Sequence, residues 1–169
     1  MFEEARYFSQ GRSLNAFHSK YGTFGALICE DLWHVSVPYL LAIDGAQVLL
    51  ALSASPTRLG DDGGEMETAR INAEQHSVYA RLLSLYLLFC NRTGIEDGVN
   101  FWGGSSVTGP QGVNAATAKY FSEDLLVCNI EPNEIQRARR FSRHVLDENP
   151  DLTVHTLHRI IRKNSGQSS

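Results

Sequence analysis

The chain has 169 residues, of which 43% are hydrophobic and 20% are charged, and its formal net charge is −4. A chain of this length is the usual size of one domain and can bury a sizeable core. It has no basic stripe with interleaved aromatic residues, no signal peptide after Met1 and no apolar run long enough to cross a bilayer, which argues against a nucleic-acid binder and a membrane protein.

The first half of the chain alternates between short apolar runs and segments with helical spacing. Residues 15–20 predict a short strand, and residues 23–28 (TFGALI) predict a buried one because they form a compact apolar run. Residues 33–43 carry apolar side chains at mainly helical spacing and predict a helix. The near-continuous hydrophobic run at 46–53 has the pattern of a strand that is covered on both faces.

The second half begins with a loop at 59–64 and a segment from residue 65 to about residue 85 that lacks glycine and proline, which predicts a long helix. Pro132 opens a further helix in its first turn. Beyond Pro150 we expect a short amphipathic piece and then a disordered end from Lys163. Four shorter strands are predicted at residues 87–91, 103–108, 113–118 and 125–130. Buried strands that alternate with helices predict a layered α/β fold.

The chain has three cysteines, Cys29, Cys90 and Cys128. They are too few and too scattered for a disulfide framework, and they lack the paired spacing of a zinc site. We therefore expect no metal ion, no cofactor and a reducing, cytoplasmic setting. Cys90 and Cys128 lie inside strand patterns and are expected in the core.

Cys29 differs from the other two because it ends the apolar strand and is followed at once by Glu30 and Asp31. A side chain at this position lies at the edge of a sheet, where ligands of α/β proteins bind. A thiol there, activated by a carboxylate base, can attack a carbonyl or nitrile carbon. The backbone N–H of Glu30 could then face the developing oxyanion. From the residues alone a structural role for Cys29 stays open, since free cysteines are among the most buried residue types.

Other arrangements have weaker support. A papain-like site would combine Cys29 with a histidine and an asparagine, but no local signature of that family is present. His34 and His76 are expected to be hydrogen-bonded structural histidines. The glycines of residues 60–64 lack the lysine and the serine or threonine of a phosphate-binding loop.

The segment GALICEDLWH at residues 25–34 resembles the nucleophile segment of the nitrilase, or carbon–nitrogen hydrolase, superfamily. Further similar segments follow in the family's order: GAQVLL at 45–50, SASP at 53–56, NRTG at 91–94, FWGGSS at 101–106 and PQG at 110–112. The resemblance implies an α/β fold that is part of a four-layer α-β-β-α sandwich. It also implies that residues 1–151 are the C-terminal portion of a hydrolase domain and that residues 152–169 are a C-terminal tail.

Members of this superfamily hydrolyse non-peptide carbon–nitrogen bonds with a cysteine, a glutamate base and a lysine, usually helped by a second glutamate. By this resemblance Cys29 is the nucleophile. Glu4, which precedes the segment YFSQG, corresponds to the second glutamate, and Glu3 takes that role if the register differs by one. The implied substrate-binding residues are Glu30, Trp33, Ser53 and Ala54, although Trp33 and Trp102 fit core packing equally well.

The sequence departs from the family pattern at two catalytic positions. The family's first glutamate and its lysine precede this segment, and Lys20, the nearest lysine before Cys29, falls in the wrong strand. Removal of one oxyanion donor typically costs about a hundredfold or more in rate. We therefore expect the chain to be inactive by itself and to need a separate or missing N-terminal half. Whether this chain is itself an enzyme stays open.

Two classes of function remain after this comparison. The first is hydrolysis of a small amide, which is preferred to a nitrile because CEDLW resembles the amidase and glutaminase branches. A glutaminase domain that feeds a synthetase is a variant of this class. The second is a non-catalytic module that dimerises or binds a partner. Helix 65–85 and the C-terminal segment are the expected interface of a homodimer or higher oligomer.

Overall fold

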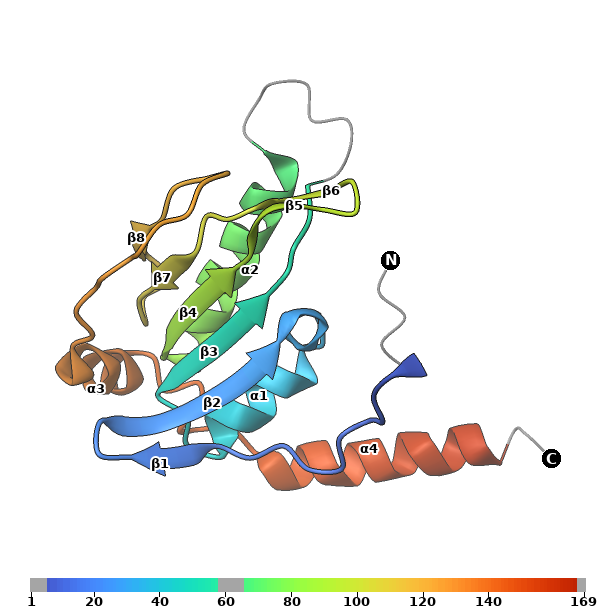
Figure 1. The fold of residues 1–169 in the computed structure, drawn as a ribbon. Helices are drawn as coiled ribbons and strands as arrows, with labels where there is room; N and C mark the ends of the chain where they lie inside the picture. Colours follow the sequence, from blue (N-terminus) through green and yellow to red (C-terminus); the bar gives the residue numbers. More distant parts are fainter. Residues whose placement is uncertain (1–5, 58–65, 167–169) are drawn as a thin grey trace.

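The computed structural model describes residues 6–57 and 66–166 (Figure 1). Within them a six-stranded sheet has the order β1-β2-β3-β4-β7-β8, and β5 pairs with β6 in a separate hairpin. The strands are β1 (Phe17–Ser19), β2 (Gly22–Ile28), β3 (Val48–Ser53), β4 (Tyr86–Asn91), β5 (Thr93–Glu96), β6 (Val99–Trp102), β7 (Ser106–Thr108) and β8 (Asn114–Thr117). The helices are a short 3₁₀ helix (Cys29–Trp33), α1 (Ser36–Ile43), α2 (Glu67–Leu83), α3 (Pro132–Phe141) and α4 (Pro150–Ser165).

The centre of the sheet is parallel. β2 pairs with β3 from Phe24↔Val48 to Ile28↔Leu52, and β3 pairs with β4 as far as Ser53↔Asn91. The carboxyl ends of β2, β3 and β4 therefore meet at one edge of the sheet. β1, β7 and β8 flank this centre with antiparallel pairings.

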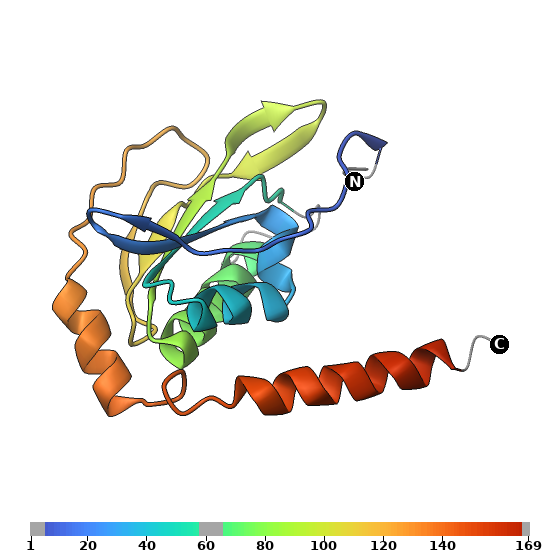
Figure 2. The same cartoon turned by 90° about the horizontal axis from the view of Figure 1, so that it is seen from below.

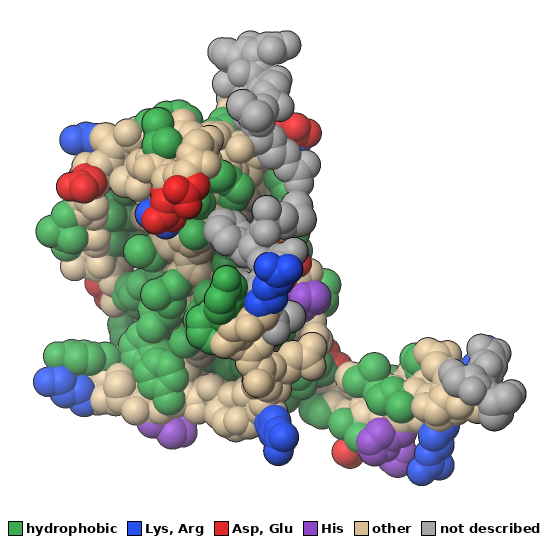
Figure 3. Space-filling model, turned by 45° about the vertical axis from the view of Figure 1, so that its right-hand side comes forward, with side chains coloured by type: hydrophobic (Ala, Val, Ile, Leu, Met, Phe, Trp, Pro, Cys, Tyr) green, Lys and Arg blue, Asp and Glu red, His purple; other side chains and the backbone are tan. Residues whose placement is uncertain are grey.

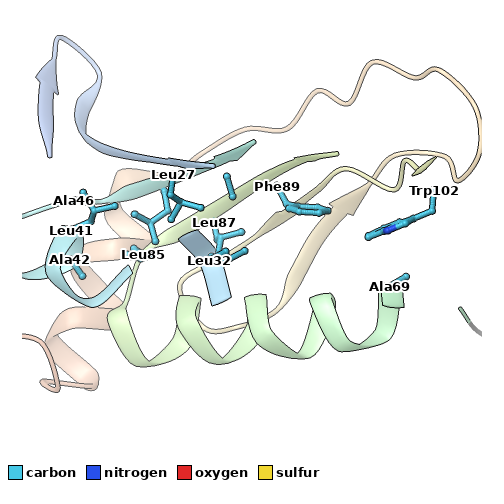
Figure 4. Close-up of a cluster of buried hydrophobic side chains, with 12 residues drawn as sticks. Leu27, Leu32, Leu41, Ala42, Ala46, Ala69, Leu85, Leu87, Phe89 and Trp102 are labelled. Atoms are coloured by element: carbon cyan, nitrogen blue, oxygen red, sulfur yellow. The ribbon is translucent and has the colours of Figure 1, made fainter. Parts of the chain in front are cut away.

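Helices α1 and α2 lie together against one face of the sheet (Figure 2). Alternate residues of a strand point to the same face, and here these residues are apolar, so they form a core with the two helices. Figure 4 shows part of this cluster between the sheet and α2. Its strand members include Leu27, Leu49, Ala51, Leu87 and Phe89, each at most 3% exposed.

The opposite face of the sheet is covered over only part of its area within the described structure. Val48, Tyr86 and Val107 pack there with Ile135 of α3. Toward the carboxyl ends of the strands, however, Ile28 is 65% exposed and Leu52 is 51% exposed. Figure 3, turned by 45° from Figure 1, shows hydrophobic side chains gathered on the body of the molecule. Within the described residues, the six-stranded sheet thus carries a helical layer on one face and is partly open on the other, which confirms the predicted α/β class.

In the second half of the chain the structure departs from the predicted secondary structure. Residues 125–130 form no strand; they run along the open face, where Leu126, Cys128 and Ile130 pack against the second core cluster. The hairpin β5–β6 is absent from the sequence prediction, although its turn at Asp97 and Gly98, both with positive φ, is a typical hairpin signal.

The C-terminal region also differs from its prediction. Instead of a short amphipathic piece, α4 runs over 16 residues and continues through Lys163, where disorder was expected. Pro150 opens it, and the side chain of Asn149 accepts a hydrogen bond from the Leu152 N–H, 3.1 Å away, which caps the first turn. α4 projects from the body, and none of its side chains is buried against the rest of the described chain (Figures 1 and 2).

Two further observations bear on earlier expectations. Cys90, expected in the core, is exposed, because it lies near the end of β4 on the uncovered face of the sheet; Cys128 is half-buried. Within residues 6–57 and 66–166, no helix combines the length and apolar character required to cross a membrane.

Candidate active site

Cys29 follows the last residue of β2 directly and begins the 3₁₀ helix, at the carboxyl edge of the parallel strands. Its φ is +46°, in the left-handed region. A non-glycine residue in this conformation costs about 1–2 kcal/mol, so the surrounding structure must hold it. The turn is closed by Asp31, whose Oδ2 accepts a hydrogen bond from the Ile28 N–H at 2.8 Å. This turn leaves the Cys29 thiol half-buried.

Ser53 lies beside Cys29 because the pairing of β2 with β3 brings the ends of the two strands together. The Ser53 hydroxyl donates a hydrogen bond to the Cys29 thiol, with 3.5 Å between Oγ and Sγ. Ser53 and the following Ala54 are both half-buried. Two of the residues expected near the nucleophile are therefore located at the same strand edge as Cys29.

The other residues considered for the site are exposed, far from Cys29 or outside the described residues. Glu30 is exposed, and Trp33, at the end of the 3₁₀ helix, is 48% exposed. Glu4 and its fallback Glu3 lie outside the described residues. Lys20 lies in the β1–β2 connection at the opposite end of β2, and its Nζ is 4.9 Å from the centre of the Tyr21 ring. Lys20 is therefore not a candidate oxyanion donor for Cys29.

Asn91, the last residue of β4, is 7% exposed and has a structural role that was not predicted from the sequence. Its Oδ1 accepts a hydrogen bond from the Ser55 N–H at 2.8 Å, and its Nδ2 donates one to the Gly103 carbonyl at 2.9 Å. The indole N–H of Trp102 adds a bond to the Ser55 hydroxyl at 3.1 Å. Asn91 and Trp102 thus fix the segment that follows Ser53. The sequence signals for Asn91 are its place at the end of a buried strand and its membership of the family-like segment NRTG, and neither indicates which backbone groups it binds.

A row of rings packs behind this segment. The Phe89 ring lies 5.7 Å from that of Trp102 and 4.6 Å from that of His76, measured between centroids. Figure 4 shows Phe89 and Trp102 at the same end of the core. Trp102 is 2% exposed, so it packs in the core rather than lining an open pocket.

His76 differs from the hydrogen-bonded histidine that the sequence predicts. It is 2% exposed, and its Nε2 has no hydrogen-bond partner among the described residues. Burial lowers the pKa of His76 to about 4, so its ring is neutral at pH 7. A neutral histidine with a pKa this low is poorly suited to exchange protons during catalysis at neutral pH. His34, in contrast, is exposed.

Within residues 6–57 and 66–166, the surroundings of the Cys29 thiol contain few polar partners. Among the residues that the structure describes, Ser53 is the side chain that hydrogen-bonds the thiol, and no carboxylate or lysine forms a hydrogen bond with it. The same residues contain no group of three or more His, Cys, Asp or Glu side chains that could hold a metal ion. The described site therefore presents a positioned thiol, a neighbouring hydroxyl and fixed strand ends.

The chain is similar in sequence to a protein family and to several characterised proteins. A family model described as carbon–nitrogen hydrolase matches residues 1–140. The chain is 31% identical over 125 residues to a glutamine-dependent NAD(+) synthetase of Acinetobacter baylyi, a match that covers 74% of this chain and 22% of the relative. It is 28% identical over 165 residues to an N-carbamoylputrescine amidase of Oryza sativa, covering 89% of this chain and 52% of the relative.

A solved structure extends this likeness to the fold. The crystal structure of a carbon–nitrogen hydrolase from Helicobacter pylori G27 matches with a TM-score of 0.82 and 25% identity, over 92% of this chain and 56% of that chain. The chain therefore spans about half the length of this structure and of the amidase, and about a fifth of the synthetase.

Proposed function

This chain belongs to the carbon–nitrogen hydrolase family, and on that premise we propose that it carries the nucleophile of an amide hydrolase, with Cys29 as the attacking residue. The observation that carries the proposal is the placement of Cys29. It stands in a left-handed conformation at the carboxyl end of β2, with the Ser53 hydroxyl 3.5 Å from its sulfur. A nucleophile on a sharp turn after a buried strand is the arrangement that many α/β hydrolases use.

The proposed reaction has two steps. A carboxylate base removes the thiol proton, and the Cys29 sulfur attacks the amide carbon to form a tetrahedral intermediate whose oxyanion faces the backbone N–H of Glu30. The C–N bond breaks, the leaving nitrogen takes a proton and departs as ammonia or an amine, and a thioester remains. Water then hydrolyses the thioester, which yields the carboxylic acid and restores the thiol. The Ser53 hydroxyl stabilises the thiolate by donating a hydrogen bond to it.

The remaining catalytic groups are proposed to come from a layer that covers the open face of the sheet. Glu4 would supply one carboxylate, and the base and the lysine would come from that additional layer. Two observations support this: Ile28 and Leu52 are at least half exposed beside the nucleophile, and the matches of this chain cover only 52% of the amidase and 56% of the solved hydrolase. We expect hydrolysis only when this face is covered.

A small amide is the proposed substrate class, ahead of a nitrile. The relatives named above act, by their names, on N-carbamoylputrescine and with glutamine, and both compounds carry a carbonyl bonded to nitrogen. Glutamine hydrolysis that supplies ammonia to a synthetase is the variant that the 31% identity with the synthetase supports. Glu30, Trp33, Ser53 and Ala54 are the residues proposed to contact the substrate.

A second role, as an assembly surface between two copies of this chain, has its own support. On α4, Val154, Leu157 and Ile161 recur at helical spacing and are each about half exposed, at 49%, 51% and 58%. Beside the start of α4, a cavity of about 350 Å³ lies between α1, α2 and residues 144–148, and Tyr79 and Leu83 are among its lining residues.

A second copy is the proposed occupant of this cavity. A helix of this length that contacts little else is marginal in water, so α4 needs a covering surface. Each copy carries both the helix and the cavity, and a two-fold dimer that exchanges α4 reciprocally covers both surfaces at once.

The catalytic proposal is tested by the release of ammonia from glutamine and from small aliphatic amides by the protein at its native length. Cys29→Ala is expected to abolish turnover. Cys128→Ala is the matched control, because Cys128 packs with the second core cluster near Tyr86, the first residue of β4, at the end of the sheet away from Cys29, and it is expected to retain full activity. Turnover that survives in Cys29→Ala would rule out Cys29 as the nucleophile.

A further inference from the structure

We propose that Asp31 is a positioning residue, which holds Cys29 in its attacking conformation through a hydrogen bond to the residue that precedes it. This inference rests on the proposed function of Cys29. It concerns the carboxylate two positions after the nucleophile, which contacts the backbone rather than the sulfur.

The bond spans the nucleophile. Oδ2 of Asp31 accepts from the Ile28 N–H at 2.8 Å, so the side chain of one residue closes a loop that contains Cys29. Cys29 itself has φ of +46°, whereas Ile28, with φ of −123°, is still extended. The change from extended to left-handed backbone therefore occurs inside the loop that Asp31 closes. A residue that favours the extended region needs such an external constraint to remain left-handed.

No neighbouring strand of the described sheet offers the same constraint on the outer side of β2. The antiparallel partner β1 pairs with β2 only from Gly22 to Phe24, so the later part of β2 has β3 as its single strand neighbour. The Ile28 N–H uses the Asp31 carboxylate as its acceptor. Asp31 thus takes the place of a missing ladder contact at the point where the strand ends.

The rest of the turn is anchored separately. Leu32 is 3% exposed and belongs to the core, and its carbonyl accepts a hydrogen bond from Nε2 of Gln75 in α2 at 3.2 Å. These contacts secure the turn after Asp31. Among the described residues, Asp31 provides the side-chain contact that reaches back across Cys29, so its loss should free the nucleophile while the turn stays attached to the core.

The interaction requires an acceptor oxygen at this position and does not require its charge. Asp31→Asn keeps a side-chain oxygen of the same reach, whereas Asp31→Ala removes it. In the protein at its native length, we expect Asp31→Ala to lower kcat at least tenfold with KM changed less than twofold, because a misplaced nucleophile fails in the chemical step. Asp31→Asn should retain kcat within about threefold, since the amide oxygen restores the bond.

A matched control is available at the opposite edge of the sheet. Asp44 also uses its carboxylate to accept a backbone N–H, that of Ala16, at 2.6 Å. Asp44→Ala is expected to lower the melting temperature without changing kcat. The proposal is overturned if Asp31→Ala keeps the wild-type kcat, or if Asp31→Asn loses as much kcat as Asp31→Ala, which would assign the effect to the charge.

A measurement on the wild-type protein guards against a variant that does not fold. The amide of Ile28 should exchange its hydrogen with solvent at least tenfold more slowly than the unbonded rate, because its N–H is held by Asp31. Unprotected exchange at Ile28 contradicts the proposal. This readout does not depend on catalysis, so it separates a failure of the positioning role from a failure of the nucleophile assignment, which the Cys29→Ala variant reports.

Discussion

The hydroxyl of Ser53 donates a hydrogen bond to the thiol of Cys29, because Ser53 is the last residue of β3 and Cys29 directly follows the last residue of the adjacent parallel strand β2. A hydrogen bond to a charged group contributes about 1.5–3 kcal/mol. Ser53→Ala should therefore lower kcat roughly ten- to a hundredfold in the native-length protein, since about 1.4 kcal/mol corresponds to a factor of ten in rate. The kcat of this variant is measured from steady-state ammonia release.

A matched control for this variant is Ser19→Ala. Ser19 makes its hydrogen bonds in the β1–β2 turn, at the far end of β2 from the nucleophile. The Ser19→Ala variant is expected to leave kcat unchanged. An unchanged kcat in Ser53→Ala would mean that the thiolate does not depend on this hydroxyl.

The buried ring of His76 predicts a loss of stability in mild acid. Burial lowers its folded-state pKa from 6.5 to about 4, so below pH 6.5 the unfolded chain takes up a proton that the folded protein does not. Its contribution to stability is present above pH 6.5 and is lost as the pH falls toward 4. With about 1.4 kcal/mol per pKa unit, the free energy of unfolding should fall by about 2 kcal/mol between pH 8 and pH 5 from this residue.

Urea unfolding at the two pH values measures this difference. His76→Gln, which cannot take up a proton, should remove most of it. His158→Gln is the control, because His158 lies exposed on α4 and should leave the pH dependence as in the wild type. Equal pH dependence in His76→Gln and the wild type would show that other groups cause the acid sensitivity.

The apolar side of α4 predicts a dimer that a single charge disrupts. Light scattering should give twice the mass of one chain for the wild type. Leu157→Asp, on the apolar side, should give the mass of a single chain, because a carboxylate would be buried without a partner. Arg159→Gln, two positions further on the basic side of the same helix, should leave the dimer intact. A monomeric wild type contradicts this prediction.

The regular part of the fold was predictable because its pattern is local. The strands β2 and β3 are apolar runs of the right length, and their buried positions alternate or repeat as covered strands require. The stretch 125–130 has the same alternation but forms no strand. Its alternate residues satisfy the pattern by packing on the face of the sheet, which depends on tertiary contacts that a local pattern does not contain.

The neighbourhood of Cys29 was predictable in part for the same reason. A cysteine at the end of a buried strand, in a segment that resembles a known family, made Cys29 the candidate nucleophile, and the structure places Ser53 beside it through the parallel pairing of β2 with β3. The contributions of Asn91 and Asp31 could not be predicted, because each is a hydrogen bond to the backbone of another segment or turn. Such bonds follow from three-dimensional placement and leave no periodic signal in the chain.

The open face of the sheet also has a consequence for the abundance of the protein in the cell. Ile28 and Leu52 are exposed and occupy paired positions at the ends of β2 and β3, and apolar side chains left exposed on a sheet face promote aggregation. As long as nothing covers that surface, the chain should be retained by chaperones or degraded by proteases. The abundance of the chain would then be limited by the supply of the layer that covers this face, more than by the rate at which the chain itself is synthesised.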